Sequence, residues 1–260
     1  MLLRYLKQEL DKGASIGELA AQGRDDLLQR ARVVTSPARI AEHNPFVRLL
    51  DELVACLDPL DKTAFERRLN GAVAIVPFEE ALHGILIPLQ ERVGELWHAA
   101  RLSIAVEHYV SKLVQQKLFS VINQLPIADH GPKVIVACPP NETHELGALT
   151  VAYHCAVRGC RVIYLGGDTP IEDLAGLCRA VEPVLVLLSL TLATQGNELR
   201  QLLQSIEEEV APLCPVGIGG LGIETAGDWG EMRNVVLLDN MDSLDRLLDR
   251  LLPARSPSSR

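Results

Sequence analysis

The spacing of apolar residues changes once along this 260-residue chain, and that change constrains the fold more than any other feature. From Leu2 to about Gln124 the apolar residues recur at helical spacing, so this half is predicted to be helices packed on helices. From Lys133 onward, short apolar runs alternate with amphipathic stretches of helical length, which is typical of a doubly wound parallel sheet. The runs are KVIVAC, CRVIYLG, VLVLLSL, PVGIGG and NVVLLD, which predict five strands.

The boundary between the two patterns is predicted at LPIADHGP, Leu125 to Pro132, because prolines and glycine favour a linker. An apolar content of 48% is ample for a buried core, and the length suggests about two domains. The charged and serine-rich C-terminal residues 254–260 are expected to be a disordered tail.

Composition excludes several classes of protein. No apolar run reaches the roughly 18 residues that a membrane span needs, and the N-terminus is not built like a signal peptide, so we expect a cytoplasmic protein without a membrane partner. The six cysteines form no C-x-x-C pair, which disfavours a zinc site and fits reduced core thiols. The net charge of −9 gives no overall attraction to nucleic acid, so DNA binding would need a local basic surface or a further segment.

The stretch NETHELG, Asn141 to Gly147, follows the first predicted strand, where ligands of open parallel sheets bind. Taken alone, the position of His144 favours an ordinary solvated loop residue. Glu142, two residues earlier, can accept the second N–H of the imidazole, as the partners of metal-ligating histidines do. Gly147 begins the next helix and lets a bulky ligand approach the backbone. Together these residues favour His144 as a metal ligand.

Two later strand ends bear on the same site. LLSLTLA places Ser189 and Thr191 on one side of a central strand, where their hydroxyls can bond a buried polar ligand. GIGGLG places Gly219 and Gly220 after the fourth strand, which leaves a channel without side chains. Strand-end serines are common and paired glycines often form turns, so the order and spacing of these residues carry the information.

The motifs ETHELG, SLT and GG resemble the D/E-x-H-x-x-G, S-x-L or S-x-T, and G-G signature of the cobalamin-binding fold of methionine synthase, corrinoid methyltransfer proteins and cobalamin-dependent mutases. The resemblance covers about Lys133 to Leu252. It implies that His144 is the lower axial ligand to cobalt and displaces the benzimidazole of the cofactor. It also implies that the nucleotide tail threads between Ser189, Thr191 and the Gly219–Gly220 pair.

In ELWHAARLSIAVEHYVSKLVQQ, Trp97 is followed after nine residues by Glu107 and His108. One unbroken helix would hold Trp97 and Glu107 about 15 Å apart, but AARL can turn the chain and Ser103 can cap a new helix, so both ends can face one pocket. The alternatives are a core tryptophan and a solvated acid.

This arrangement resembles the adenosylcobalamin-dependent photoreceptor regulators of the MerR family, the CarH and LitR group. The resemblance implies that Trp97, Glu107 and His108 contact the adenosyl group on the upper face. It also implies that His98 takes the vacated cobalt position after light breaks the cobalt–carbon bond. The alternative for His98 is a surface helix histidine. The segment LGGDTP, Leu165 to Pro170, resembles the second strand end of the same group.

Residues 1–35 resemble the last helices of a MerR winged helix-turn-helix domain, and Ser15 and Glu18 fit a capping box. The helix-turn-helix that would precede them is not in this sequence. Two interpretations stay open: the start lies upstream and the protein binds DNA, or the protein is a shortened sensor that acts on a protein partner. A homo-oligomer is expected in either case.

The predicted fold is thus α plus α/β: a four-helix-bundle cap over 40–125, followed by a Rossmann-like, flavodoxin-like cobalamin domain with a five-stranded parallel sheet over 132–253. The predicted function is a light-responsive cobalamin sensor of a transcriptional regulator, and not an enzyme. Two alternatives stay open, a corrinoid methyl-carrier protein and a cofactor-free protein-interaction module.

Overall fold

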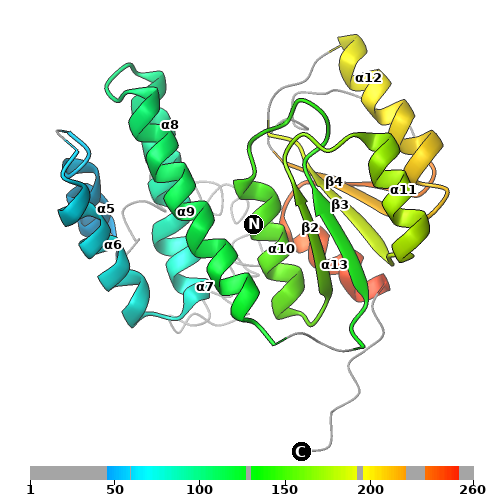
Figure 1. The fold of residues 1–260 in the computed structure, drawn as a ribbon, viewed down its shortest axis with the longest axis horizontal. Helices are drawn as coiled ribbons and strands as arrows, with labels where there is room; N and C mark the ends of the chain where they lie inside the picture. Colours follow the sequence, from blue (N-terminus) through cyan, green and yellow to red (C-terminus); the bar gives the residue numbers. More distant parts are fainter. Residues whose placement is uncertain (1–45, 59, 127–129, 192–195, 221–231, 252–260) are drawn as a thin grey trace, which may run out of the picture. The chain divides into compact units, whose positions relative to one another are not determined.

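The computed structural model describes residues 46–58, 60–126, 130–191, 196–220 and 232–251 (Figure 1). The chain divides into two compact units, Met1–Val110 and Ser111–Arg260, and this boundary falls inside a long helix, α9 (Ile104–Gln124). The predicted segment 1–35 with its Ser15–Glu18 capping box, part of the predicted linker and the predicted tail 254–260 lie outside the described residues.

The described part of the first unit, residues 46–58 and 60–110, is helical, as its apolar spacing predicts. Before α9 its elements are α5 (Val47–Ala55), α6 (Lys62–Ile75), α7 (Phe78–Ala81), the π-helical turn η1 (Leu82–Leu86) and α8 (Ile87–His98). α7, η1 and α8 follow one another without a break, so the described residues form four helical runs, the number predicted for the cap. The wide turn η1 ends just before Pro88, which has no N–H to give to the carbonyl of Gly84.

The core of the helical unit lies between these runs and contains fully buried side chains from each of α5, α6, η1 and α8, among them Leu53, Phe65, Leu82, Leu89 and Val93. The first turns of α9 are tied to α6, because the Tyr109 hydroxyl donates to Glu66 Oε1 at 2.7 Å and the Tyr109 ring lies 6.1 Å from the Phe65 ring.

The second unit contains a five-stranded parallel sheet, and every predicted apolar run forms a strand. The strands are β1 (Lys133–Ala137), β2 (Arg161–Gly166), β3 (Leu185–Ser189), β4 (Val216–Gly219) and β5 (Val235–Leu238). Their order in the sheet is β2-β1-β3-β4-β5, the flavodoxin-like order that the sequence predicts. All four neighbouring pairs are parallel.

Helices cover both faces of the sheet (Figure 1). The remaining elements are α10 (Leu146–Val157), α11 (Ile171–Val181), α12 (Gly196–Ser205), the π-helical turn η2 (Ile206–Val210) and α13 (Met241–Leu251). α10 and α13 share one buried cluster with Val134 and Val136 of β1, whereas α11, α12 and η2 share another with Ile135 and Ala137. Successive β1 side chains therefore face opposite layers, as strand geometry requires.

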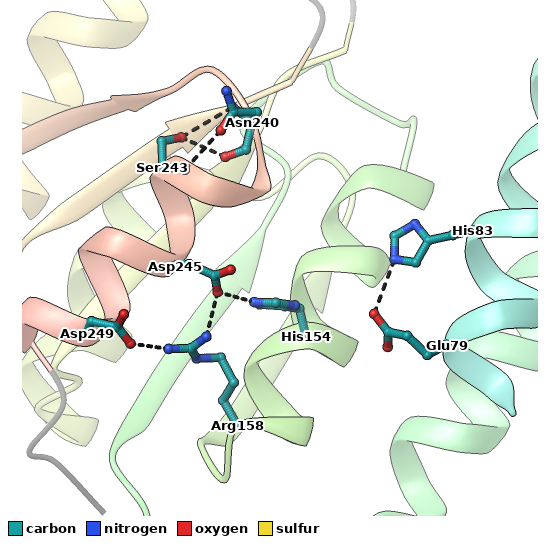
Figure 2. Close-up of polar contacts among 8 residues, drawn as sticks. All are labelled: Glu79, His83, His154, Arg158, Asn240, Ser243, Asp245 and Asp249. Atoms are coloured by element: carbon teal, nitrogen blue, oxygen red, sulfur yellow. Dashed lines mark hydrogen bonds and ion pairs between the residues drawn. The ribbon is translucent and has the colours of Figure 1, made fainter. Parts of the chain in front are cut away.

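Polar contacts join α10 to α13 on their common face (Figure 2). His154 Nε2 and Arg158 Nη1 each lie 2.6 Å from Asp245 Oδ1, and Arg158 also bonds Asp249. The side chains of His154, Arg158 and Asp245 are between 22% and 35% exposed, so water weakens these contacts only in part. They hold the C-terminal end of α10, whose N-terminal end follows the His144 loop.

All six cysteines are free and buried, in agreement with their prediction as core thiols. None of the helices formed by the described residues has the length and apolar character to cross a membrane.

Candidate functional site

The loop that carries His144 joins β1 to α10 and is organised by one buried acid, Glu142, whose side chain is 1% exposed. Oxygen Oε1 of Glu142 accepts from the backbone N–H of His144 at 2.7 Å and lies 2.8 Å from His144 Nδ1. The other oxygen, Oε2, accepts from the backbone N–H of Thr191 at 2.7 Å. Glu142 therefore ties the loop after β1 to the end of β3.

These contacts favour one tautomer of the neutral imidazole. A carboxylate accepts hydrogen bonds, so the neutral ring has its proton on Nδ1 and its lone pair on Nε2. Among the described residues no hydrogen bond to Nε2 is present, and the His144 side chain is 52% exposed. The Glu142 contact expected from the sequence is confirmed, and the geometry suits a histidine that ligates a metal through Nε2.

Cys138, directly after β1, is another side chain near this loop of a type that can ligate a metal ion. Its thiol donates to the His144 carbonyl at 3.7 Å, and burial, with the Glu142 and Glu145 carboxylates, raises the pKa of Cys138 to about 12. Burial therefore favours the protonated form of this thiol. Within the described ranges no cluster of three or more His, Cys, Asp or Glu residues is arranged to hold a metal ion.

Gly147 and Ser189 meet at the start of α10. A Cβ atom on Gly147 would lie 2.7 Å from the Ser189 hydroxyl, so the absence of a side chain lets α10 pack against the end of β3. Ser189 is 7% exposed and lies on the α10 side of the sheet. Part of the reason for glycine here is this contact within the protein, which the sequence did not reveal.

The Gly219–Gly220 pair differs from its prediction in one respect, because Gly219 is the last residue of β4 rather than a residue after it. Gly220 has a φ of 116°, and a Cβ atom there would lie 2.3 Å from the Leu190 carbonyl oxygen. At Gly219 the nearest atom to a Cβ would be the Leu238 carbonyl oxygen at 3.2 Å. Glycine is therefore favoured at both positions because the backbone of Gly220 closely approaches the residue after β3 and that of Gly219 closely approaches β5, in addition to any ligand.

Trp97 and His98 lie at the C-terminal end of α8, in the first unit. The chain turns after them, with Ala100 at a φ of 54°, and α9 begins at Ile104 with Ser103 Oγ accepting from Val106 N at 3.4 Å. The predicted break and Ser103 cap are thus confirmed. The two rings are 4.5 Å apart and both are exposed, Trp97 at 37%.

A shallow surface depression begins at Trp97 and is otherwise lined by Ala100, Arg101, Leu102, Ser103 and Ile104. Glu107 is not among the residues that line this depression, and the pocket expected to join Trp97 and Glu107 stays a prediction. Glu107 lies one turn into α9 with its side chain 18% exposed.

The partners of the Glu107 side chain include His108 and Gln90. Oε2 lies 2.7 Å from His108 Nδ1, and Oε1 accepts from the Gln90 side-chain amide at 3.2 Å. The sequence showed the neighbouring histidine but missed Gln90, which lies 17 positions away on α8. A second missed residue is Tyr164 of β2, whose hydroxyl donates to Glu145 Oε2 at 2.8 Å across 19 positions. Neither pair has a local sequence signal.

Comparison with known proteins gives the family. Two family models, each described as a B12 binding domain, match residues 49–121 and 132–238. The HTH-type transcriptional repressor CarA of Myxococcus xanthus is 34% identical over 212 residues, which cover 82% of this chain and 67% of CarA. The chain belongs to the cobalamin-binding, MerR-type family of regulators. The HTH-type transcriptional repressor CarH of the same organism is 29% identical over 248 residues, which cover 95% of this chain and 82% of CarH.

Among solved structures, the monomethylamine corrinoid protein of Methanosarcina barkeri matches with a TM-score of 0.60 and 16% identity, covering 79% of this chain and 99% of that protein. At this identity the match shows a shared fold alone. The fold alone therefore does not decide the function, whereas the repressor relatives favour a transcriptional regulator.

Proposed function

We propose that the second unit binds cobalamin, with His144 as the lower axial ligand to cobalt, and that the chain is the sensor part of a transcriptional regulator. The observation that carries this proposal is the His144 imidazole, with Nδ1 at 2.8 Å from buried Glu142 and Nε2 directed away from it. Imidazole held in this way suits a first-row transition ion. Bound cobalamin would supply a light-absorbing cobalt centre with two exchangeable axial positions.

The nucleotide tail is proposed to pass along Gly147, Ser189, Thr191, Gly219 and Gly220. Support comes from their common position at the carboxyl ends of β1, β3 and β4, where parallel sheets bind ligands. The bond from Thr191 N to Glu142 also shows that the β3 end and the His144 loop lie side by side.

The upper face is proposed to carry an adenosyl group that Trp97, Glu107 and His108 contact, with His98 as the ligand of the photoproduct. An aromatic ring with 37% exposure at a chain turn is available to stack on a flat ligand. The Glu107 carboxylate, which contacts Gln90 and His108, has acceptor oxygens of the kind that bond ribose hydroxyls.

As a sensor, the chain acts by population shift: the adenosyl group favours one arrangement of the helical unit and its loss favours another. The expected readout is a change of homo-oligomeric state. The relatives are repressors, so DNA is the proposed target if a complete helix-turn-helix domain accompanies this chain, and a protein partner is the target otherwise. No turnover is needed in either case.

The test is gel filtration and absorption spectroscopy of the purified chain with adenosylcobalamin, before and after green light. The expected result is a nitrogen-ligated spectrum in the dark, an irreversible spectral change in the light, and a shifted elution volume. The same spectrum and elution volume before and after illumination would contradict the sensor proposal. A colourless protein after incubation would instead favour an interaction module.

A methyl carrier would give a different pattern, because its upper face must remain open to an enzyme. It would bind methylcobalamin productively and tolerate Trp97→Ala. The sensor is expected to prefer adenosylcobalamin and to lose that preference in Trp97→Ala, so a competition between the two cobalamins separates the proposals.

A further inference from the structure

The residue after His144 is a second acid, Glu145, which the proposed ligand site does not use. Glu145 occupies the N-cap position of α10, where an acidic side chain ordinarily accepts from the unpaired N–H groups of the first turn. Here the side chain makes no such cap bond. Its oxygen Oε2 accepts from the Tyr164 hydroxyl at 2.8 Å instead. The carboxylate is thus directed toward β2 rather than toward its own helix.

Tyr164 is itself held in place. Its ring meets the Phe119 ring of α9 edge to face, with centroids 5.2 Å apart and an interplanar angle of 84°. Burial and the neighbouring Glu145 carboxylate raise the pKa of Tyr164, so the phenol remains a neutral hydrogen-bond donor across the physiological range.

The backbone at the end of β2 fits closely around this contact. A Cβ atom on Gly166 would lie 3.2 Å from Glu145 Oε2, and one on Gly167 would lie 3.1 Å from the Glu142 carbonyl oxygen. The Asp168 N–H also donates to that carbonyl at 2.8 Å. The loop between Glu142 and Glu145 therefore packs directly on the end of β2.

His144 lies between two anchors. Glu142 fastens the loop to the end of β3 through Thr191 N, and Glu145 fastens it to β2 through Tyr164. We propose that Tyr164, supported by Phe119 and bonded to Glu145, is a positioning residue that holds the His144 loop in the geometry needed to ligate cobalt. This inference rests on the proposed function, because it concerns the same axial ligand.

The experiment measures how firmly His144 ligates cobalt. The wild-type protein is loaded with adenosylcobalamin in the dark, and its absorption spectrum is followed as the pH is lowered. Protons compete with cobalt for the imidazole, so a weaker cobalt–histidine bond is lost at a higher pH. Tyr164→Phe keeps the ring and removes one hydroxyl. In this variant the pH at which half of the cobalt–histidine ligation is lost is expected to rise by about one unit. This shift of the midpoint corresponds to a bond about tenfold weaker.

Four further variants separate positioning from general damage. Tyr109→Phe removes the same kind of tyrosine–glutamate bond in the helical unit and should keep the wild-type midpoint. Glu145→Gln keeps an acceptor oxygen for the phenol and should remain close to wild type, whereas Glu145→Ala should match Tyr164→Phe. The Tyr164→Phe, Glu145→Ala double variant should show no additional shift, because both changes remove one contact.

The outcomes distinguish this inference from the function on which it rests. A wild-type protein without a nitrogen-ligated spectrum, or one whose spectrum survives His144→Ala, overturns the proposed function. A wild-type protein with ligation, combined with an unchanged midpoint in both Tyr164→Phe and Glu145→Ala, overturns the positioning role. Additive shifts in the double variant overturn it as well. If Tyr164→Phe fails to fold, the comparison of Glu145→Ala with Glu145→Gln decides.

Discussion

Two glutamate–histidine pairs of the described residues, Glu142–His144 in the second unit and Glu107–His108 in the first, are built in opposite ways. Glu142 is 1% exposed and binds His144 together with two backbone N–H groups, whereas Glu107 is 18% exposed and binds His108 and the side chain of Gln90. His144 is anchored to the sheet, while His108 is 68% exposed on a helix surface. The contacts of Glu142 include backbone N–H groups, whereas Glu107 is contacted by the side chains of Gln90 and His108.

This difference fits the two roles proposed for the pairs, an axial ligand for His144 and a contact with the upper ligand for Glu107 and His108. An axial ligand must keep its position through every state of the sensor, so it benefits from rigid strand ends. The residues proposed to contact the upper ligand must respond to its loss, which contacts between side chains allow. The two pairs can be compared by the same substitutions.

The largest expected effect concerns the two glutamates. Glu142→Ala leaves the backbone N–H groups of His144 and Thr191 without their acceptor and should lower the free energy of unfolding by about 3 kcal/mol. Glu107→Ala removes only side-chain contacts and should lower it by less than about 1 kcal/mol. Urea unfolding of both variants without cobalamin measures the difference. Equal losses would show that the pairs are not built differently.

An intermediate effect is expected where α10 meets β3. Gly147→Ala places a Cβ atom 2.7 Å from the Ser189 hydroxyl and should cost about 1–2 kcal/mol of unfolding free energy. Ser189→Ala removes that oxygen and leaves the nearest Ser189 atom, its Cβ, at an ordinary 3.9 Å, so the double variant should recover most of the loss. A double-variant cycle by urea unfolding measures the recovery. If the effects of Gly147→Ala and Ser189→Ala on the unfolding free energy simply add in the double variant, the contact with the Ser189 hydroxyl does not explain why residue 147 is a glycine.

The smallest effect on stability is expected for a substitution of Gln90 in the helical unit. Gln90→Leu removes one donor to Glu107 and should change the unfolding free energy by about 1 kcal/mol or less. Its preference for adenosylcobalamin over methylcobalamin should nevertheless fall up to about tenfold, since Glu107 is no longer oriented. Gln115→Leu, which breaks an exposed contact with Lys112, is the matched control. An unchanged preference in Gln90→Leu would remove Gln90 from the site.

Local sequence information predicted the fold well and the site in part. Each of the five strands follows from a short apolar run, and the break between α8 and α9 follows from Ser103. The Glu142–His144 contact was predictable because the residues are two positions apart. The bonds from Gln90 to Glu107 and from Tyr164 to Glu145 join distant positions, so only the folded chain reveals them.

Gly147 shows the same limit of local sequence information. The motif placed it at the start of a helix and associated it with a ligand, but its closest neighbour in the structure is the Ser189 hydroxyl. A motif therefore locates a residue correctly while leaving open which of several close contacts requires it.

The most direct test of the central claim is the absorption spectrum of His144→Ala with adenosylcobalamin in the dark, beside wild type and His83→Ala. His83 is a suitable control because it also has a glutamate partner, Glu79 at 3.3 Å, on an exposed surface of the helical unit (Figure 2). The account predicts a nitrogen-ligated spectrum for wild type and His83→Ala, and its loss in His144→Ala. A nitrogen-ligated spectrum that persists in His144→Ala would contradict the assignment of His144 as the cobalt ligand.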